Sequence, residues 1–264
     1  MAKLTGPIKF TGKLDGISAL KRIGSEGIIL RPRYGPSKKD IDTKPSYANT
    51  KRENYEFGGR STAAKWIHDG YLALKPVSDG YNLSRLNALL KPIQDMDTQS
   101  KYGKRSVALS YWRELLEGFQ LSKWYSFESV LRSPIDCSLS REELMAKVIV
   151  PSLLPSVNFV PPTAHAFFRV VATLNIVPDL YFNEIKYRPG GNYDAFRPEV
   201  VKTEWMAVET GAEAINLELQ MPEAPPDDAF SLVLTLGIEM GTAKSKVLIQ
   251  GVKYAGCGKI LAVV

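Results

Sequence analysis

The amino-acid sequence predicts an α+β protein: a basic N-terminal β-hairpin arm, a short helical region and a C-terminal Ig-like antiparallel β-sandwich. Three observations lead to this prediction. Segments of the C-terminal half alternate between apolar and polar residues, the middle of the chain has helical periodicity, and positive charge is concentrated near the N-terminus. We place the arm at residues 1–60, the helical region at 61–125 and the sandwich at 126–264.

Alternation is clearest in three segments, 168–176, 215–221 and 230–240. Successive side chains of a strand point to opposite faces, so this pattern is typical of a sheet with one buried face. Several such strands bury their apolar faces against one another, which favours a sandwich or a barrel. We expect the apolar set of these segments to point inward and Thr235 to lie on the opposite face. The inward set includes Val170, Leu217, Leu232 and Leu234.

Turn signals and prolines divide the C-terminal half into short candidate strands. Their spacing of 8–15 residues is typical of a sandwich, because proline is tolerated between strands rather than within them. The candidate strands are 127–132, 145–150, 166–176, 180–187, 200–208, 213–221, 229–240, 245–254 and 259–264.

Helical patterning is expected to begin near Arg60. Ser61 and Thr62 can cap a helix that runs to Leu74. Asn82 or Ser84 can cap a second helix, whose apolar residues fall on one stripe. Pro92 lies inside this stripe, and we expect it to kink or break the helix. The stripe consists of Leu83, Leu86, Leu89, Leu90 and Ile93.

The net charge of +6 is unevenly distributed along the chain. Residues 1–66 contain 14 Lys/Arg and 6 Asp/Glu, a net of +8, whereas residues 67–264 have a net of −2. This asymmetry predicts that the N-terminal quarter contacts an acidic partner. The partner could be nucleic acid or the body of a neighbouring copy.

Two short apolar runs in the arm, Ile8–Phe10 and Ile28–Leu30, can pair as a hairpin. An isolated hairpin is marginal in water, so we expect this arm to dock on another surface. Cations and aromatic residues then interleave, a pattern that can bind phosphates and bases but is also typical of protein interfaces. These residues are Lys38, Lys39, Lys44, Lys51, Arg52, Arg60 and Lys65, with Tyr34, Tyr47, Tyr55 and Phe57.

Residue types that carry chemistry do not form a recognisable site. His68 and His165 lack metal-ligand spacing. The segment 256–259 resembles the end of a phosphate loop, but Lys253 replaces the first glycine and Ile260 replaces Ser/Thr. We therefore predict a non-enzymatic protein with no catalytic, cofactor-binding or metal-binding residue.

The two cysteines, Cys137 and Cys257, are too few for a disulfide framework, although one bridge between them stays open. No apolar run approaches the roughly 18 residues that a membrane span requires, and residues 1–7 lack the apolar core of a signal peptide. We therefore expect a cytoplasmic protein that does not enter a membrane.

The first half of the chain resembles a family of bacterial proteins that is frequent in Bacteroidota genomes. These proteins carry a Gly-rich N-terminal hairpin, seen here in residues 5–18, and an Arg-x-Asn-x-Glu-Phe-Gly-like stretch that enters a helix. Arg52, Asn54, Glu56 and Phe57 match that stretch, and residues 115–119 also resemble the family. The resemblance implies no activity, so it assigns no catalytic residue.

Together these features predict a structural protein that self-assembles into a filament, tube or phage-tail-like particle through its N-terminal arm. The alternative is a nucleic-acid-binding protein that uses the same arm. The residues expected at the assembly interface are Ile8, Phe10, Ile28, Leu30, Tyr47, Arg52, Tyr55 and Phe57.

Overall fold

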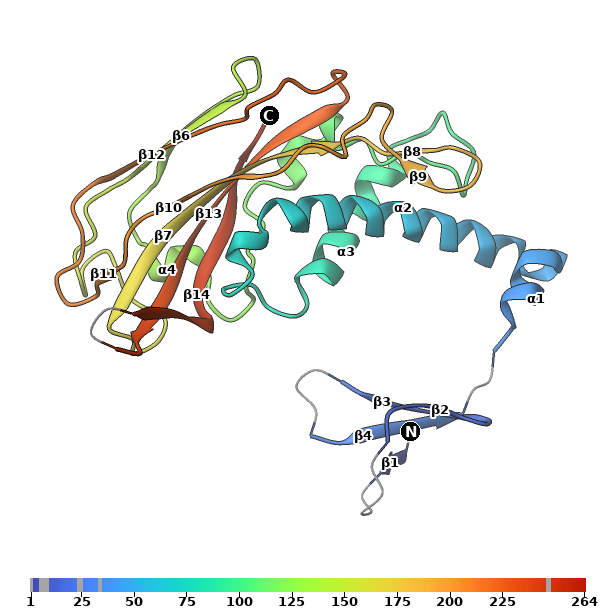
Figure 1. Ribbon diagram of the computed structural model, residues 1–264. Coiled ribbons are helices and arrows are strands. Elements are labelled where there is room, and N and C mark those ends of the chain that lie inside the picture. The colour runs from blue at the N-terminus through green and yellow to red at the C-terminus, as the bar shows by residue number, and fades with distance from the viewer. Residues whose placement is uncertain (1, 5–9, 23–25, 33–34, 246–247) are drawn as a thin grey trace. The chain divides into compact units, whose positions relative to one another are not determined.

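The computed structural model describes the chain except for residues 1, 5–9, 23–25, 33–34 and 246–247 (Figure 1). Helices and antiparallel sheets are mixed in it, which confirms the predicted α+β class. The chain divides into two compact units, Met1–Glu53 and Asn54–Val264. The predicted boundary at residue 60 falls inside a helix that spans Ala48–Gly70 and includes the division between the two units.

The N-terminal unit contains a four-stranded antiparallel sheet with the order β1-β4-β3-β2. A two-residue connection, Asp15 and Gly16, joins β2 to β3, and Asp15 adopts the left-handed conformation (φ 45°). A helix, α1, and a 3-10 helix, Pro45–Tyr47, follow the sheet. The bounds are β1 Ala2–Leu4, β2 Gly12–Leu14, β3 Ile17–Lys21, β4 Ile28–Pro32 and α1 Lys38–Thr43.

Ser37 starts α1 through a reciprocal capping box. Its Oγ accepts a hydrogen bond from the Asp40 backbone N–H (3.1 Å), and the Asp40 carboxylate accepts one from the Ser37 N–H (3.0 Å). These bonds satisfy donors that the first turn of a helix otherwise leaves free.

The long helix α2 spans Ala48–Gly70, so the prediction of a helix beginning near Arg60 was wrong. Two features kept the sequence pattern from indicating the first half of this helix. Glu56 and Arg60 are buried, so an apolar stripe is missing there. Gly59 reads as a helix breaker, yet a Cβ at this position would lie 2.8 Å from the Tyr187 ring. The glycine lets the Tyr187 ring pack closely against the helix backbone, a contact that exists only in the folded chain.

The second predicted helix is α3, Asn82–Asp95, which continues through Pro92. Ile93 and Gln94 beyond the proline are buried, and the Met96 N–H bonds to the Pro92 carbonyl (3.1 Å). Packing therefore holds the last turn despite the missing donor. The remaining helices are short: the 3-10 turns Leu72–Leu74, Leu109–Tyr111 and Arg113–Leu115, and α4, Phe127–Val130.

The larger unit has two main antiparallel sheets and a small hairpin. One sheet has the order β10-β7-β13-β14, with β11 also paired to β7, the other has the order β12-β6-β5, and β8 pairs with β9. The bounds are β5 Asp136–Ser140, β6 Met145–Val150, β7 Phe167–Pro178, β8 Tyr181–Phe182, β9 Tyr187–Arg188, β10 Glu199–Lys202, β11 Met206–Ala207, β12 Ile215–Gln220, β13 Phe230–Ala243 and β14 Ile249–Val263.

Several strand predictions need correction. The segment 180–187 overlaps two short strands, β8 and β9, and the segment 200–208 overlaps β10 and β11. The segment 127–132 begins with helix α4, capped by Ser126, whose Oγ accepts from the Ser129 N–H (3.2 Å). Strand β5 was missed. The two predicted strands 245–254 and 259–264 are one strand, β14. Gly256 lies within this strand, where a Cβ would be 2.3 Å from the Ile238 carbonyl oxygen, so close strand pairing requires this glycine.

The two main sheets of the larger unit share one hydrophobic core. Leu217 from β12 and Val170, Leu232 and Leu234 from β7 and β13 are buried in it, which confirms their predicted inward direction. Phe159 and Phe168 pack in the same core with their ring centroids 4.5 Å apart. Burial of these apolar side chains holds the sheets together.

The other face of the large sheet is covered by α2, α3 and the 3-10 segments, so that sheet is a central layer (Figure 1). A Cβ at Gly70 of α2 would lie 2.4 Å from Asn175, and one at Gly237 of β13 would lie 2.4 Å from Leu74. Thr235 is only 1% exposed here. The alternation that predicted an open face instead reflects small and polar side chains beneath closely packed helices.

Thr173 pairs with Thr235 on the neighbouring strand and therefore lies on the same covered face. It offers a test of the packing on that face. Its side chain is fully buried, and its Oγ1 has no hydrogen-bond partner among the described residues. We expect Thr173→Val to leave the free energy of unfolding unchanged or to raise it by up to about 1 kcal/mol, because a buried hydroxyl without a partner is costly. Urea unfolding would measure this; a loss of stability would indicate that the hydroxyl is satisfied.

Candidate interaction surfaces

The register of the N-terminal sheet places most of its apolar residues on one face, together with Lys21, which pairs with Ile28. Direct partners across antiparallel strands share a face. Leu4 pairs with Ile28, Ala19 with Leu30, and Ile17 with both Leu14 and Pro32. We call this set the apolar sheet face: Leu4, Leu14, Ile17, Ala19, Ile28, Leu30 and Pro32.

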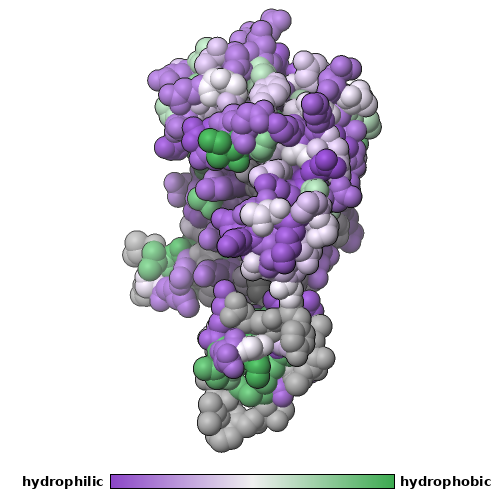
Figure 2. All heavy atoms as spheres, turned by 90° about the vertical axis from the view of Figure 1, so that its right-hand side faces the viewer, coloured by the Kyte–Doolittle hydropathy of each residue, from purple (hydrophilic) through white to green (hydrophobic). Residues whose placement is uncertain are grey.

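The apolar sheet face has little cover. Among the described residues of Met1–Glu53, Ala19 is the only buried one. Leu14 is 62% exposed and Ile17 is 46% exposed. Figure 2 shows apolar atoms gathered on the N-terminal sheet. An exposed apolar patch of this kind is typical of an interaction site.

The opposite face of the same sheet, which we call the basic sheet face, carries three cations beside the paired Leu20 and Ile29. Lys3 pairs with Ile29, while Lys13 and Arg31 both pair with Ser18, so all three cations lie away from the apolar sheet face. The Arg31 Nε is 3.4 Å from the Ser18 Oγ. The whole N-terminal unit contains 12 Lys/Arg and 5 Asp/Glu, a net of +7.

The predicted hairpin between the segments around Phe10 and Leu30 does not form as expected. Strand β4 pairs with β3 and β1, whereas Phe10 is half-buried and outside any strand. Ile8 lies outside the described residues. The Asp15-Gly16 pair, a typical two-residue hairpin loop, was the missed signal. Of the predicted interface residues, Ile28 and Leu30 do share the apolar sheet face.

The other predicted interface residues lie in the helical segment rather than on the sheet. Tyr47 ends the 3-10 helix and is half-buried, and the Arg52 guanidinium donates to Asn49 Oδ1 within α2 (3.0 Å). Tyr55 packs against Phe182 at 5.3 Å between ring centroids. Phe57 is 56% exposed. The predicted set is therefore divided between the two units.

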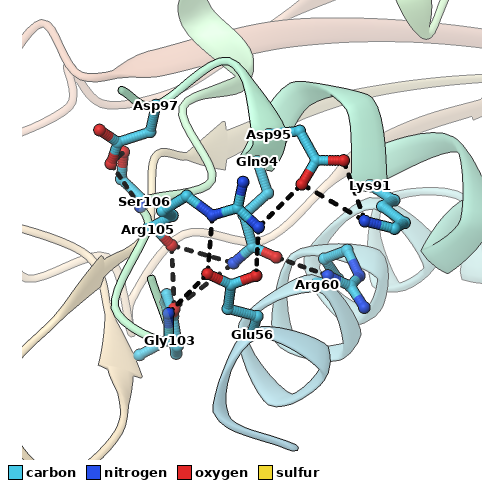
Figure 3. A network of polar contacts seen from close by, with 10 residues as sticks. Glu56, Arg60, Lys91, Gln94, Asp95, Asp97, Gly103, Arg105 and Ser106 are labelled. Atoms are coloured by element: carbon cyan, nitrogen blue, oxygen red, sulfur yellow. Dashed lines mark hydrogen bonds and ion pairs between the residues drawn. The ribbon is translucent and has the colours of Figure 1, made fainter. Parts of the chain in front are cut away.

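A buried polar network around Glu56 was missed, although Glu56 belongs to the family-like stretch (Figure 3). Its fully buried carboxylate accepts from Arg105 Nε (2.7 Å), Arg105 Nη2 (2.6 Å) and the Gly103 N–H (2.8 Å). Arg105 Nη2 also lies 2.9 Å from Asp95. The bidentate pairing of Arg105 with Glu56 joins the loop after α3 to α2.

A second line of bonds supports the network. Arg60 Nη1 donates to Gln94 Oε1 (2.7 Å), and Gln94 Nε2 donates to the Arg105 carbonyl (2.9 Å). The Tyr187 hydroxyl donates to the same carbonyl (2.9 Å). Long-range partners of this kind satisfy polar groups that burial alone would penalise.

The network also shifts pKa values. Burial pushes the pKa of Glu56 upward, but the hydrogen bonds from Arg105 and Gly103 outweigh it, so the pKa is lowered. The hydrogen bond to Glu56 raises the pKa of Arg105 despite its burial. Both groups are therefore charged at neutral pH, and the network is structural in character.

Cys137 and Cys257 are free thiols, and burial raises the pKa of each. No group of three His, Cys, Asp or Glu side chains in the described ranges could hold a metal ion. No helix in the described part combines the length and apolar composition needed to cross a membrane.

A search of protein-family models, curated proteins and solved structures finds no match to this chain. Its class therefore rests on the fold and the surfaces: an α+β protein with an amphipathic N-terminal sheet and a larger unit built from helices and two antiparallel sheets.

Proposed function

We propose that this chain is a non-enzymatic structural protein that assembles with copies of itself through the apolar sheet face. The carrying observation is that Leu14 and Ile17 on this face are widely exposed, and that Ala19 is the only buried residue among the described residues of the unit. Sheets bury such a face against another layer. Lys3, Lys13 and Arg31 lie on the opposite face, so among the described strand residues Lys21 is the one cation that a second copy would meet on the apolar sheet face.

The larger unit supports an Ig-like sandwich as the body of this assembly. If β5, β6, β7, β12, β13 and β14 are named A, B, C, E, F and G, then A, B and E share one sheet and C, F and G share the other. This is the grouping of immunoglobulin domains. Strand β10 joins strand C on its outer edge, as an additional strand does in variable-type domains.

An open-ended particle such as a filament, tube or phage-tail-like assembly needs a compact body and contacts that do not close on themselves. A compact larger unit with a separate N-terminal unit provides these parts. We propose a cytoplasmic protein whose principal partner is itself.

Nucleic-acid binding is the second candidate, because the basic sheet face presents cations that can neutralise phosphates. Phosphate contacts release counterions, so affinity for nucleic acid falls by roughly a thousandfold or more between 50 and 200 mM salt for six or more contacts. Apolar burial depends much less on salt. Salt dependence therefore separates the two functions.

The double variant Leu14→Asp/Ile17→Asp is expected to abolish large assemblies, because two charges would be placed on the apolar sheet face. Both side chains are exposed, so the sheet itself should form. Light scattering and negative-stain microscopy of the full-length protein at 50 and 200 mM salt would measure the effect.

The matched control is Lys13→Glu/Arg31→Glu on the opposite face, which should retain assembly. A wild-type chain that stays monomeric at high concentration would contradict the proposal. Loss of assembly in the control alone, together with nuclease-sensitive material absorbing at 260 nm, would support nucleic-acid binding instead.

A further inference from the structure

A second surface of the larger unit has the chemistry of a docking groove. It lies between α2 and α3, where Asn87 Nδ2 donates to Ser61 Oγ (2.7 Å) and holds the helices side by side. Along α2 it extends from Phe57 to Lys65, about 12 Å or two helical turns at 1.5 Å per residue. We call it the α2–α3 groove; its volume is about 630 Å³.

The lining of the α2–α3 groove is apolar and cationic. Phe57 and Leu83 are 56% and 43% exposed, and Arg60, Lys65 and Lys91 supply positive charge, whereas no Asp or Glu lines it. An occupant that complements this lining has apolar side chains and a carboxylate. The N-terminal unit, with its net charge of +7, is a poor match.

Two of these cations have capacity for a further partner. Arg60 is only 5% exposed; its Nη1 bonds to Gln94, and its buried Nε has no hydrogen-bond partner among the described residues. Lys65 is exposed and forms no ion pair within the described part of the chain. Lys91, in contrast, is already paired with Asp95 at 2.9 Å.

The chain itself presents a complementary surface at its 3-10 turns. Trp112 is 39% exposed and Leu115 is 40% exposed. The Leu115 N–H bonds to the Trp112 carbonyl (3.3 Å), and residues three apart in such a turn lie on the same side. Of the two residues between them, Glu114 is exposed and acidic, whereas the cation Arg113 is half-buried. Together with Tyr111, which is 75% exposed, these residues form what we call the aromatic turn, residues 111–115.

We propose that the aromatic turn of one copy docks in the α2–α3 groove of the next, with Glu114 meeting Lys65. This inference rests on the proposed self-assembly and adds a second contact to it. Trp112 and Leu115 would cover Phe57 and Leu83. Because groove and turn are different surfaces, the contact is head-to-tail, which leaves a free surface at each end of a growing row.

A charge exchange tests the contact in the full-length protein. Lys65→Glu and Glu114→Lys are each expected to raise the concentration at which the chain assembles by about tenfold, since each places like charges together. The double variant Lys65→Glu/Glu114→Lys should restore assembly, because the pair is attractive again. Light scattering against protein concentration gives the result.

Two further variants test the apolar part of the contact. Ala88→Arg should block the exposed groove wall, and Leu115→Lys should place a cation in a cationic groove; both should impair assembly. Leu154→Lys is the matched control, because Leu154 is 52% exposed and belongs to neither surface. It should assemble like the wild type.

Cross-linking distinguishes the head-to-tail arrangement from a symmetric one. The chain Ala88→Cys/Leu115→Cys should form a ladder of covalent oligomers under oxidation. Each single variant should not, and the wild type controls for the half-buried Cys137. Dimers from one single variant alone would indicate a symmetric contact and overturn the proposal.

The outcomes separate this inference from the proposed function. A wild-type chain that never assembles contradicts both. If the wild type assembles and Leu14→Asp/Ile17→Asp prevents it, but Leu115→Lys has no effect, only the groove contact is wrong. The same conclusion follows if the charge-exchanged double variant is as impaired as the single variants, or if the groove proves to hold a lipid or another acidic peptide.

Discussion

Glu56→Gln is expected to lower the free energy of unfolding by about 3–5 kcal/mol, the usual cost of breaking a buried ion pair by removing one partner. The amide keeps the size of the side chain but loses the charge that faces Arg105 at 2.6 and 2.7 Å. It also directs an NH2 group toward a donor. Chemical denaturation at pH 7 would measure the difference.

The difference in stability between the wild type and Glu56→Gln should depend on pH. Because the folded state lowers the pKa of Glu56, the carboxylate contributes stability above its unfolded pKa of about 4.3, and this contribution is lost as pH falls through the lowered folded pKa. Wild type and variant should therefore converge in stability as the pH falls below about 4.3.

The exposed pair Lys147 and Glu218 provides a control for the Glu56 network. Glu218→Gln removes a surface ion pair with a 3.3 Å separation, and such pairs contribute about 1 kcal/mol or less. A loss at Glu56 no larger than the loss at Glu218 would show that the buried network does not support the fold.

Leu234→Ala is expected to cost about 2–5 kcal/mol, because the truncation leaves a cavity in the core between the two sheets. Leu234 is fully buried and lies in β13, paired with Leu174 on one side and Ala262 on the other. Urea unfolding would give the change in free energy.

Leu154→Ala is the matched comparison for Leu234. Leu154 is 52% exposed, so its truncation should change the stability by about 0.5 kcal/mol or less. Similar losses at both leucines would mean that the two sheets do not share the core described above.

The sequence by itself was sufficient to predict the α+β class and the inward-facing residues of the strongest strands. Val170, Leu232 and Leu234 alternate with small or polar neighbours, and alternation is a local property of an extended chain. The stripe predicted for α3 is confirmed in part for the same reason: Leu86, Leu90 and Ile93 are buried, whereas Leu83 is 43% exposed and Leu89 is half-buried. Apolar residues at a regular period report the buried face directly.

Polar groups whose partners lie far away along the chain could not be predicted from the periodicity of apolar residues. Glu56 reads as a solvent-exposed residue because its partner, Arg105, is 49 positions away. Gly59, Gly237 and Gly256 each allow another part of the chain to approach closely, and the local sequence does not show which part. Only the tertiary structure identifies that neighbour.

The apolar sheet face was partly predictable from the sequence, whereas the α2–α3 groove was not. Sequence alone placed positive charge and apolar runs in the N-terminal quarter and selected Ile28 and Leu30 as interface residues. Tertiary structure decided that they share a face with Leu14 and Ile17, because strand register, which a short sequence leaves open, determines which side chains are neighbours. It also formed the α2–α3 groove, whose walls come from two helices and whose charge depends on side chains that the chain brings together only on folding.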